Sequence, residues 1–221
     1  MSSRSLNVGI LLMACSLVLG GGLTACSNVA ASSEAERALE QLVIVVRPTK
    51  DGSYRRAAFG RAWADTDHNS CNQRDDALLA AVDKLRPFTA RQQSDCDHDM
   101  VAGTWHDPYS GQSRTFGDLK MPEQAMAIPI DHIVALGVSW RYGAKHWTPE
   151  RRLEFATDLN NLQPTTARIN SIKSDHDAAS WRPSKPQQCA YASRYIQIKQ
   201  TYALPVDEPE GRALREMLDT C

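Results

Sequence analysis

The apolar segment at residues 126–140, MAIPIDHIVALGVSW, contains an acid and an imidazole side by side, Asp131 and His132. Side chains alternate across a β-strand, so a strand over 126–136 would place His132 on the same face as several aliphatic side chains. A segment that served only as core would carry Val or Ile at that position. The segment therefore predicts a buried strand that also presents a functional Asp–His pair.

Asp131 and His132 can face one site only if the local backbone is irregular. Adjacent residues of a regular strand point to opposite faces, so Asp131 and His132 can share one site only if the strand ends, twists or bulges there. Pro129 before the pair and Gly137 after it favour such an irregularity. We therefore expect the strand to be irregular at this point.

The N-terminus is typical of an export signal. One basic residue, Arg4, precedes the apolar run 8–22, and the sequence LTAC follows at 23–26. This ending resembles a bacterial lipobox, in which Cys26 becomes the lipidated N-terminus. A permanent transmembrane anchor is the alternative, but the three consecutive glycines at 20–22 and a length marginal for a bilayer disfavour it. We expect residues 1–25 to be a lipoprotein signal peptide, and the exported protein to be held at the cell envelope by its lipid or released outside the cell.

The remaining chain is long enough for one domain with a real core. Residues 27–36 are small and polar and predict a flexible tether, and 36–46 is a first apolar element. We therefore divide the exported chain into a lipidated tether with this apolar element, residues 26–53, and one domain, residues 54–221.

Four cysteines lie in that domain: Cys71, Cys96, Cys189 and Cys221. No two of them form a C-x-x-C pair, which disfavours a structural zinc site, whereas an even number in an exported protein predicts disulfides. Among the three connectivities we favour Cys71–Cys96 and Cys189–Cys221, because each pair then constrains one end of the domain. Each bond would add about 3–4 kcal/mol by loop closure.

The apolar periodicity and the turn residues predict mixed secondary structure. Thr148 and Pro149 are typical of a helix start. Helices are expected at 75–85, 147–159, 165–175, 189–204 and 208–218, a short strand at 161–164, and a hairpin or tight loop at 102–112.

The second strand and the helix after it carry further polar residues. Asn161 opens the strand, and Asn170 and Lys173 are three residues apart on the helix, so they project on the same side. Ile169 and Ile172 are expected to mark the buried side of this helix. The resulting order is strand, insertion, strand and helix.

The motifs IDHIVALGVSW, FATDLNNLQPTTARINSIKSD and SWRPSKPQQCAYASRYIQIK resemble those of secreted HNH endonucleases, which are related to the C-terminal nuclease domain of GmrSD-type restriction enzymes. Upstream, YRRAAFGRAWADTDHNSCNQRDDAL and GTWHDPYSG also resemble exported bacterial members. The resemblance covers roughly residues 54–221. It implies an α+β fold with a ββα-metal (His-Me finger) core at about 126–175, additional helices, an N-terminal extension and disulfides.

The resemblance also implies residue roles. His132 would be the general base, Asp131 and Asn170 would bind one divalent cation, and Asn161 would fix the loop that carries the histidine. An imidazole with a pKa near 6.5 can take a proton from water, and a hard cation held by carboxylate and amide oxygens can neutralise a phosphate. Mg²⁺ is the expected ion, and Mn²⁺, Ca²⁺ or Zn²⁺ accept similar ligands.

The charge distribution bears on the substrate. Residues 132–199 carry ten Lys or Arg and five Asp or Glu, whereas the whole chain has a net charge of −1. A basic segment suits an anionic substrate, although a solvated basic surface has the same composition. Lys173 and Arg74 are expected to contact phosphates; the alternatives are a solvated charge for Lys173 and pairing with local aspartates for Arg74.

These observations predict a metal-dependent endonuclease that cleaves DNA, with RNA as a second candidate substrate. Little sequence preference is expected, because no separate element for reading base edges is present. We expect a monomer without a protein partner. The alternative is a non-catalytic envelope lipoprotein that uses the same fold to bind a polymer or a partner.

The loop at 65–76, DTDHNSCNQRDD, partly matches a calcium-binding EF-hand loop. Four residues with side-chain oxygens stand at positions 1, 3, 5 and 12 of that pattern: Asp65, Asp67, Asn69 and Asp76. However, Ser70 replaces the glycine of position 6, and position 12 is normally a bidentate Glu. We favour a loop held by Cys71 over a cation site.

Overall fold

The computed structural model describes residues 33–221. The expected signal peptide, the lipidation site Cys26 and the first part of the expected tether lie outside these residues. No helix within the described range is long and apolar enough to cross a membrane.

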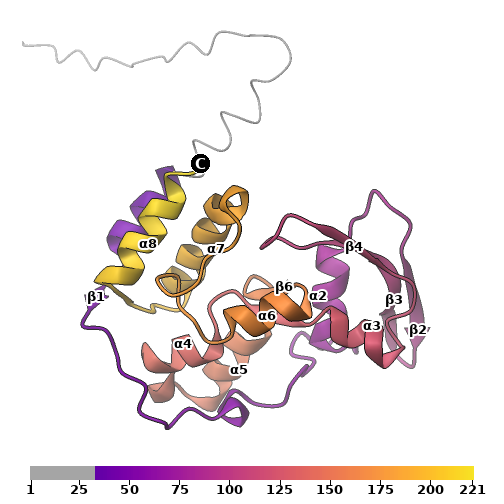
Figure 1. Cartoon of the computed structure of the whole chain (residues 1–221). Coiled ribbons are helices and arrows are strands. Elements are labelled where there is room, and N and C mark those ends of the chain that lie inside the picture. The colour runs from indigo at the N-terminus through magenta and orange to yellow at the C-terminus, as the bar shows by residue number, and fades with distance from the viewer. Residues whose placement is uncertain (1–32) are drawn as a thin grey trace, which may run out of the picture.

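The first described residues pack against the end of the chain. Residues 33–41 are helical, and strand β1 (Ile44–Val45) pairs in parallel with β7 (Val206–Asp207). Ala35 and Leu39 of this helix are buried in the same cluster as residues of α8 (Glu208–Leu218), and the two helices lie side by side in Figure 1. Residues 33–36 are therefore part of the fold, although the sequence predicts a tether there.

A three-stranded antiparallel sheet forms the other side of the molecule (Figure 1). Its strands, in spatial order, are β2 (Thr89–Gln93), β3 (Cys96–His106) and β4 (Ser113–Phe116). Helix α2 (Gln73–Ala81) packs on β3, and α3 (Pro122–Ala127) follows β4. The hairpin expected at 102–112 is confirmed as the β3–β4 turn.

Helices dominate the rest of the domain. They are α4 (Leu136–Arg141), α5 (Pro149–Thr157), α7 (Gln188–Thr201), α8 and three short 3₁₀ segments, η1 (Arg56–Phe59), η2 (Ala144–His146) and η3 (Lys185–Gln187). The Thr148 side chain accepts a hydrogen bond from the backbone N–H of Arg151 at the start of α5, which confirms it as the N-cap.

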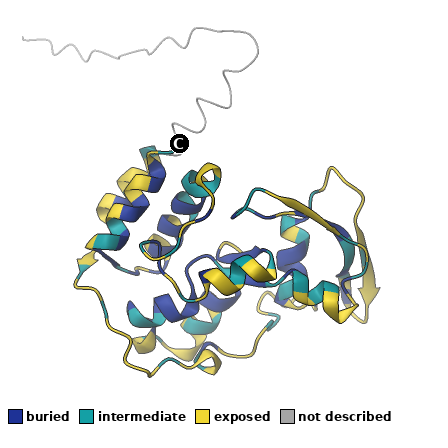
Figure 2. Ribbon diagram, in the orientation of Figure 1, coloured by how far each residue is buried: buried dark blue, intermediate teal, exposed yellow. Residues whose placement is uncertain are grey.

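Strand β5 (Ile130–His132) and β6 (Leu162–Pro164) form an antiparallel pair, and α6 (Ala167–Lys173) follows β6. This unit lies between two hydrophobic clusters. Ile130 belongs to the cluster beside the three-stranded sheet, whereas Val134 belongs to the larger helical cluster. Figure 2 shows buried ribbon in this central region, between the more exposed ends of the molecule.

The single long strand predicted over 126–136 is wrong. Residues 126–127 close α3, the strand spans three residues, and α4 begins at Leu136. The apolar residues of this segment fill two separate clusters, so the chain turns after His132 and does not continue along one sheet. The expected strand at 161–164 and the helix at 165–175 are confirmed as β6 and α6, within two residues of the expected bounds.

The fold is therefore a mixture of helices and strands, as the sequence predicts. Two disulfides close it, Cys71–Cys96 and Cys189–Cys221, with Cα–Cα distances of 4.6 and 5.1 Å. Both predicted pairings are confirmed.

Candidate active site

His132 is the last residue of β5, and its ring is fixed by one contact. The Nε2 atom lies 2.9 Å from the carbonyl oxygen of Ala156 in α5. A carbonyl only accepts hydrogen bonds, so Nε2 carries the proton and Nδ1 of the neutral ring is left as an acceptor. Burial lowers the pKa of His132 to about 4, and the positive charges of Arg56 and Lys173 contribute. The ring is therefore neutral at pH 7.

Asn161 holds the two residues that follow His132. Its side chain is fully buried, and its Oδ1 accepts from the backbone N–H of Val134 at 2.9 Å, while Nδ2 donates to the carbonyl of Val134 at 3.3 Å. The backbone carbonyl of Asn161 also accepts from the N–H of Ile133 at 2.8 Å. Asn161 therefore ties the start of β6 to Ile133 and Val134.

Asp131 is buried and has two partners for one oxygen. Its Oδ2 accepts from the hydroxyl of Tyr109 at 2.7 Å and pairs with the Lys173 ammonium at 2.8 Å. Burial raises the pKa of Asp131, although Lys173 opposes this shift. Tyr109 is a site residue without a predicted role; its signal in the sequence is the GTWHDPYSG motif, which the resemblance includes.

The geometric condition on Asp131 and His132 can now be compared with the structure. The β5–β6 register is regular from Ile130 to His132, and the strand ends at His132. The strand ends only after His132, so both residues lie within the regular pairing, and the Asp131 carboxylate contacts Tyr109 and Lys173 whereas the His132 ring contacts Ala156. That the two side chains share one site stays a prediction. Lys173 connects the two residues, because its ammonium also donates to the carbonyl of His132 at 2.7 Å.

Lys173 does not occupy the position expected of a phosphate contact. Its side chain is 0% exposed, since the ammonium is enclosed between Asp131 and His132. On the expected buried side of α6, Ile169 is partly buried and packs against the larger hydrophobic cluster, whereas Ile172 is 53% exposed, so the expectation is wrong for Ile172. The structure thus gives Lys173 the contacts of a residue that positions Asp131.

Arg74 is likewise engaged inside the fold. Its Nη2 donates to the carbonyls of Ala125 and Ile128, each at 3.0 Å, and burial lowers its pKa. It makes no ion pair within residues 33–221, although the charge of the neighbouring Asp75 acts against burial and raises the pKa of Arg74. Arg74 instead ties α2 to the segment that leads into β5.

The predicted basic segment is not one continuous free surface. Lys199 is fully buried in an ion pair with Glu210 at 2.6 Å, and Arg141 pairs with Asp175 at 2.8 Å. These cations compensate acids within the fold. The net positive count of residues 132–199 therefore overstates the charge available to a substrate.

An exposed cation near His132 comes from another part of the chain. Arg56 begins η1, which packs against α5, and its charge lowers the pKa of His132. Its side chain is exposed and has no hydrogen bond or ion pair to any residue of 33–221. The sequence signal for Arg56 is the YRRAAFG motif, which the resemblance includes without giving it a role.

The residues near β5 are chemically suited to a hard cation. Asp131 Oδ2 already has two partners, which leaves Oδ1 of that carboxylate. The side chain of Asn170, half-buried on α6, makes no hydrogen bond to other described residues and offers an amide oxygen. A carboxylate and an amide oxygen are ligands that Mg²⁺ and Ca²⁺ accept. The Lys173 ammonium neutralises part of the carboxylate charge, so it would weaken the binding of a cation.

Comparison with known proteins assigns the chain to a family. Residues 73–217 match the C-terminal domain of GmrSD restriction endonucleases. An uncharacterised secreted protein of Arthroderma benhamiae is 32% identical to the chain over 197 residues, which cover 88% of each protein. No solved structure matches. The chain therefore belongs to the family of GmrSD restriction endonuclease C-terminal domains, whose membership indicates a nuclease-type function.

Proposed function

We propose that this protein is a metal-dependent endonuclease that hydrolyses phosphodiester bonds of DNA, with RNA as a second candidate substrate. The observation that carries the proposal is His132. Its Nε2 is fixed on the carbonyl of Ala156, which leaves Nδ1 as an acceptor, and Asn161 holds the loop that follows. Membership of a nuclease family supports the same conclusion.

In this proposal β5, β6 and α6 form a ββα-metal core. Asp131 Oδ1 and the Asn170 amide would hold one divalent cation, Mg²⁺ first, with Mn²⁺, Ca²⁺ or Zn²⁺ as alternatives. When bound, such a cation supplies positive charge that stabilises the phosphate. Tyr109 and Lys173 fix the carboxylate of Asp131 from the other side.

The protein's own residues perform two further tasks. His132 Nδ1 accepts a proton from the attacking water, while the Nε2–H bond to Ala156 keeps the ring in place. Arg56, and no longer Lys173 or Arg74, contacts the phosphate backbone, because its guanidinium is exposed and close enough to His132 to influence its pKa. Backbone contacts of this kind give little sequence preference.

Two observations bear on the cellular location of the protein. Two disulfides fit an oxidising compartment, and a relative that covers most of the chain is described as secreted. We propose that the protein is exported. Lipid attachment at Cys26, a signal peptide over 1–25, a domain spanning 54–221 and a monomeric state stay predictions from the sequence.

The test is cleavage of supercoiled plasmid and of a structured RNA by purified protein with intact disulfides. His132→Ala is expected to lower the rate by about 10²–10⁴-fold, and EDTA to abolish cleavage. His146→Ala, the same substitution at an exposed histidine of η2, is the matched control and should keep the activity. If the folded protein cuts neither substrate with any of the four cations, the proposal fails, and the polymer-binding alternative can be tested by binding to the same nucleic acids.

The proposed phosphate contact of Arg56 is tested by the salt dependence of DNA binding. Arg56→Gln is expected to weaken DNA binding and to reduce the slope of log K against log salt by about 1, since one phosphate contact is lost. Arg61→Gln provides an exposed control from the same segment. An unchanged salt slope in Arg56→Gln would assign the phosphate contact to another residue.

A further inference from the structure

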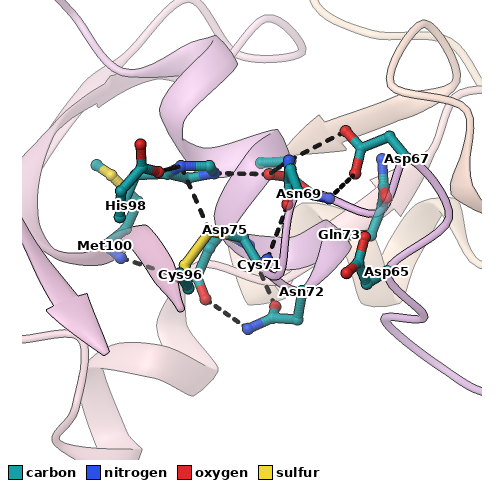
Figure 3. A network of polar contacts seen from close by, with 12 residues as sticks. Asp65, Asp67, Asn69, Cys71, Asn72, Gln73, Asp75, Cys96, His98 and Met100 are labelled. Atoms are coloured by element: carbon teal, nitrogen blue, oxygen red, sulfur yellow. Dashed lines mark hydrogen bonds and ion pairs between the residues drawn. A yellow bond between two sulfur atoms is a disulfide. The ribbon is translucent and has the colours of Figure 1, made fainter. Parts of the chain in front are cut away.

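Helix α2 has different surroundings at its two ends. Its start is enclosed by the loop 65–76, which is held by the Cys71–Cys96 disulfide and by its own hydrogen bonds, as the sequence predicts (Figure 3). The following turns line a pocket of about 300 Å³, through Ala77, Ala80 and Ala81. A pocket of this size is at the lower end of the range that holds small molecules, and the proposed nuclease mechanism does not use it.

The pocket combines an apolar wall with a positive charge. Its other walls come from β3, the turn after α5, β6 and α7, through His106, Leu159, Leu162, Gln163 and Arg194. The leucines and the alanines of α2 supply the apolar surface. Arg194 is the one permanent cation among the lining residues, and none of these residues is an acid. The composition of the walls therefore favours an anion that also has an apolar part.

The partners of Arg194 leave its charge uncompensated. The side chain is half-buried, and burial lowers its pKa. Its Nη1 donates to Oε1 of Gln163, and its Nη2 donates to the carbonyl of Asn160 at 3.1 Å. Both acceptors are neutral, and Arg194 makes no ion pair within residues 33–221. A guanidinium has five N–H donors, so three of them stay free for a ligand, and a partly desolvated cation is stabilised by an anion.

The neighbouring groups of the protein do not supply that anion. Asp158 acts on Arg194 only through its charge, because its Oδ2 accepts from the hydroxyl of Tyr202 at 3.0 Å and its Oδ1 from the backbone N–H of Asn160 at 2.8 Å. Tyr109, which also acts on Arg194, donates its hydroxyl proton to Asp131 and has a pKa well above 10, so it is uncharged. The pocket thus lacks an anionic partner for its cation.

We propose that this pocket binds the phosphate of a nucleotide. The free N–H groups of Arg194 donate to the phosphate oxygens, which the planar guanidinium matches in geometry. His106, whose Nδ1 lies 3.4 Å from the Ser113 hydroxyl, can add a donor through Nε2. The apolar wall of α2 packs against the base or the sugar. The choice of a nucleotide among anions rests on the proposed nuclease function, whereas the anion site itself does not.

The pocket adjoins the strand pair of the proposed active site. Gln163, which accepts from Arg194, is the register partner of Asp131, and Leu162 is the register partner of His132. A nucleotide in the pocket would therefore lie against β6. Its phosphate could belong to a free mononucleotide or to one end of a bound strand, and binding experiments distinguish these two sources.

The test is calorimetric titration of the purified protein, disulfides intact, with adenosine 5′-monophosphate (AMP), inorganic phosphate and adenosine. EDTA is present, so binding is measured without cleavage. AMP is expected to bind with a Kd of about 10⁻³ M or lower, phosphate more weakly, and adenosine most weakly. A 5′-phosphorylated trinucleotide that binds at least tenfold more tightly than AMP would identify a strand as the source of the phosphate. Equal or weaker binding would identify the free nucleotide.

Three variants make the result specific. Arg194→Gln removes the charge and should weaken the binding of AMP and of phosphate at least about tenfold. Arg215→Gln, the same substitution at an exposed arginine of α8 outside the pocket, should leave both Kd values unchanged. Ala80→Phe narrows the pocket from an exposed position of α2 and should weaken AMP binding while phosphate binding persists. This variant keeps the test decisive if Arg194→Gln does not fold.

Two results would overturn the proposal. One is a folded wild-type protein that binds neither AMP nor phosphate at millimolar concentrations. The other is AMP binding that is unchanged in both Arg194→Gln and Ala80→Phe. If cleavage is absent but AMP binding depends on Arg194, the nuclease proposal fails and the nucleotide site stands.

Discussion

Replacing Lys173 with methionine distinguishes the two roles considered for this residue. Methionine keeps most of the aliphatic length and removes the ammonium, which lies 2.8 Å from Asp131 Oδ2 and 2.7 Å from the carbonyl of His132. In the variant, the buried Asp131 carboxylate loses the ammonium and keeps the hydrogen bond from the hydroxyl of Tyr109. If Lys173 positions Asp131, the cost appears in stability; if it contacts phosphate, the cost appears in nucleic-acid binding.

The magnitude follows from the burial of both partners. Breaking a buried ion pair by removing one charge costs about 3–5 kcal/mol, and the retained Tyr109 bond places this case near the lower end, at about 3 kcal/mol. With a urea m-value of about 2 kcal/mol/M, the unfolding midpoint should fall by about 1.5 M. In an Asp131→Asn background the same change should cost about 1 kcal/mol, which gives a coupling of about 2 kcal/mol.

The assay is equilibrium unfolding in urea, followed by tryptophan fluorescence, with EDTA present so that bound cations do not contribute. Lys185→Met is the matched control, because this lysine is exposed, and it should change the free energy of unfolding by less than about 0.5 kcal/mol. A similarly small change for Lys173→Met, together with weaker DNA binding, would refute the reasoning and return Lys173 to the phosphate.

Three further changes test other parts of the structure. Asn161→Ala should lower the free energy of unfolding by about 2 kcal/mol, since buried backbone groups lose their partners; an unchanged urea midpoint would contradict this. Arg47→Met removes a partner of Asp207. Burial alone would raise the pKa of Asp207, but the hydrogen bond from Arg47 helps to bring that pKa below its ordinary value. Its cost, about 1–2 kcal/mol, should therefore be complete above pH 3.8 and fade as the pH falls through the lower folded-state pKa; a pH-independent difference in urea midpoint would exclude this pairing. Cys189→Ser/Cys221→Ser should cost about 3–4 kcal/mol, and an unchanged Tm would show that this bond does not support the fold.

The helices with capping signals were predictable because those signals are local, whereas α3, α4 and the helix at 33–41 were not predicted. The expected bounds of the last helix, 208–218, coincide with α8, where the Asp207 side chain accepts from the backbone N–H of Glu210 and Pro209 stands in the first turn. Thr148 and Pro149 give the start of α5 in the same way. Capping side chains and first-turn prolines act within a few residues, so the sequence alone contains the information.

The strands were harder to predict, because strand residues are stabilised by partners that are distant in the sequence. β2 is almost wholly exposed and has no apolar alternation, so the sequence gives no strand signal for it. The 126–136 segment has a strand signal that is too long, because two clusters compete for its apolar residues. Local pattern cannot show which cluster each residue will join.

The same distinction applies to the candidate site. The sequence pattern singles out Asp131, His132 and Asn161, and the structure places all three at the β5–β6 pair. Charge alone does not show whether a cation faces solvent or an internal acid. The sequence therefore could not show that Lys173 is enclosed by the fold, or that Arg56, seventy-six positions before His132, is an exposed cation near it.

The two disulfides also make the stability of the fold depend on the redox state of its surroundings. Loop closure contributes about 3–4 kcal/mol for each bond, against a total stability of about 5–15 kcal/mol for a typical domain. A newly made chain in a reducing cytoplasm lacks both bonds and much of its margin, and it gains them only after reaching an oxidising space. For a member of a nuclease family, this dependence would protect the genome of the producing cell, because the fold that positions His132 would mature only where that genome is absent.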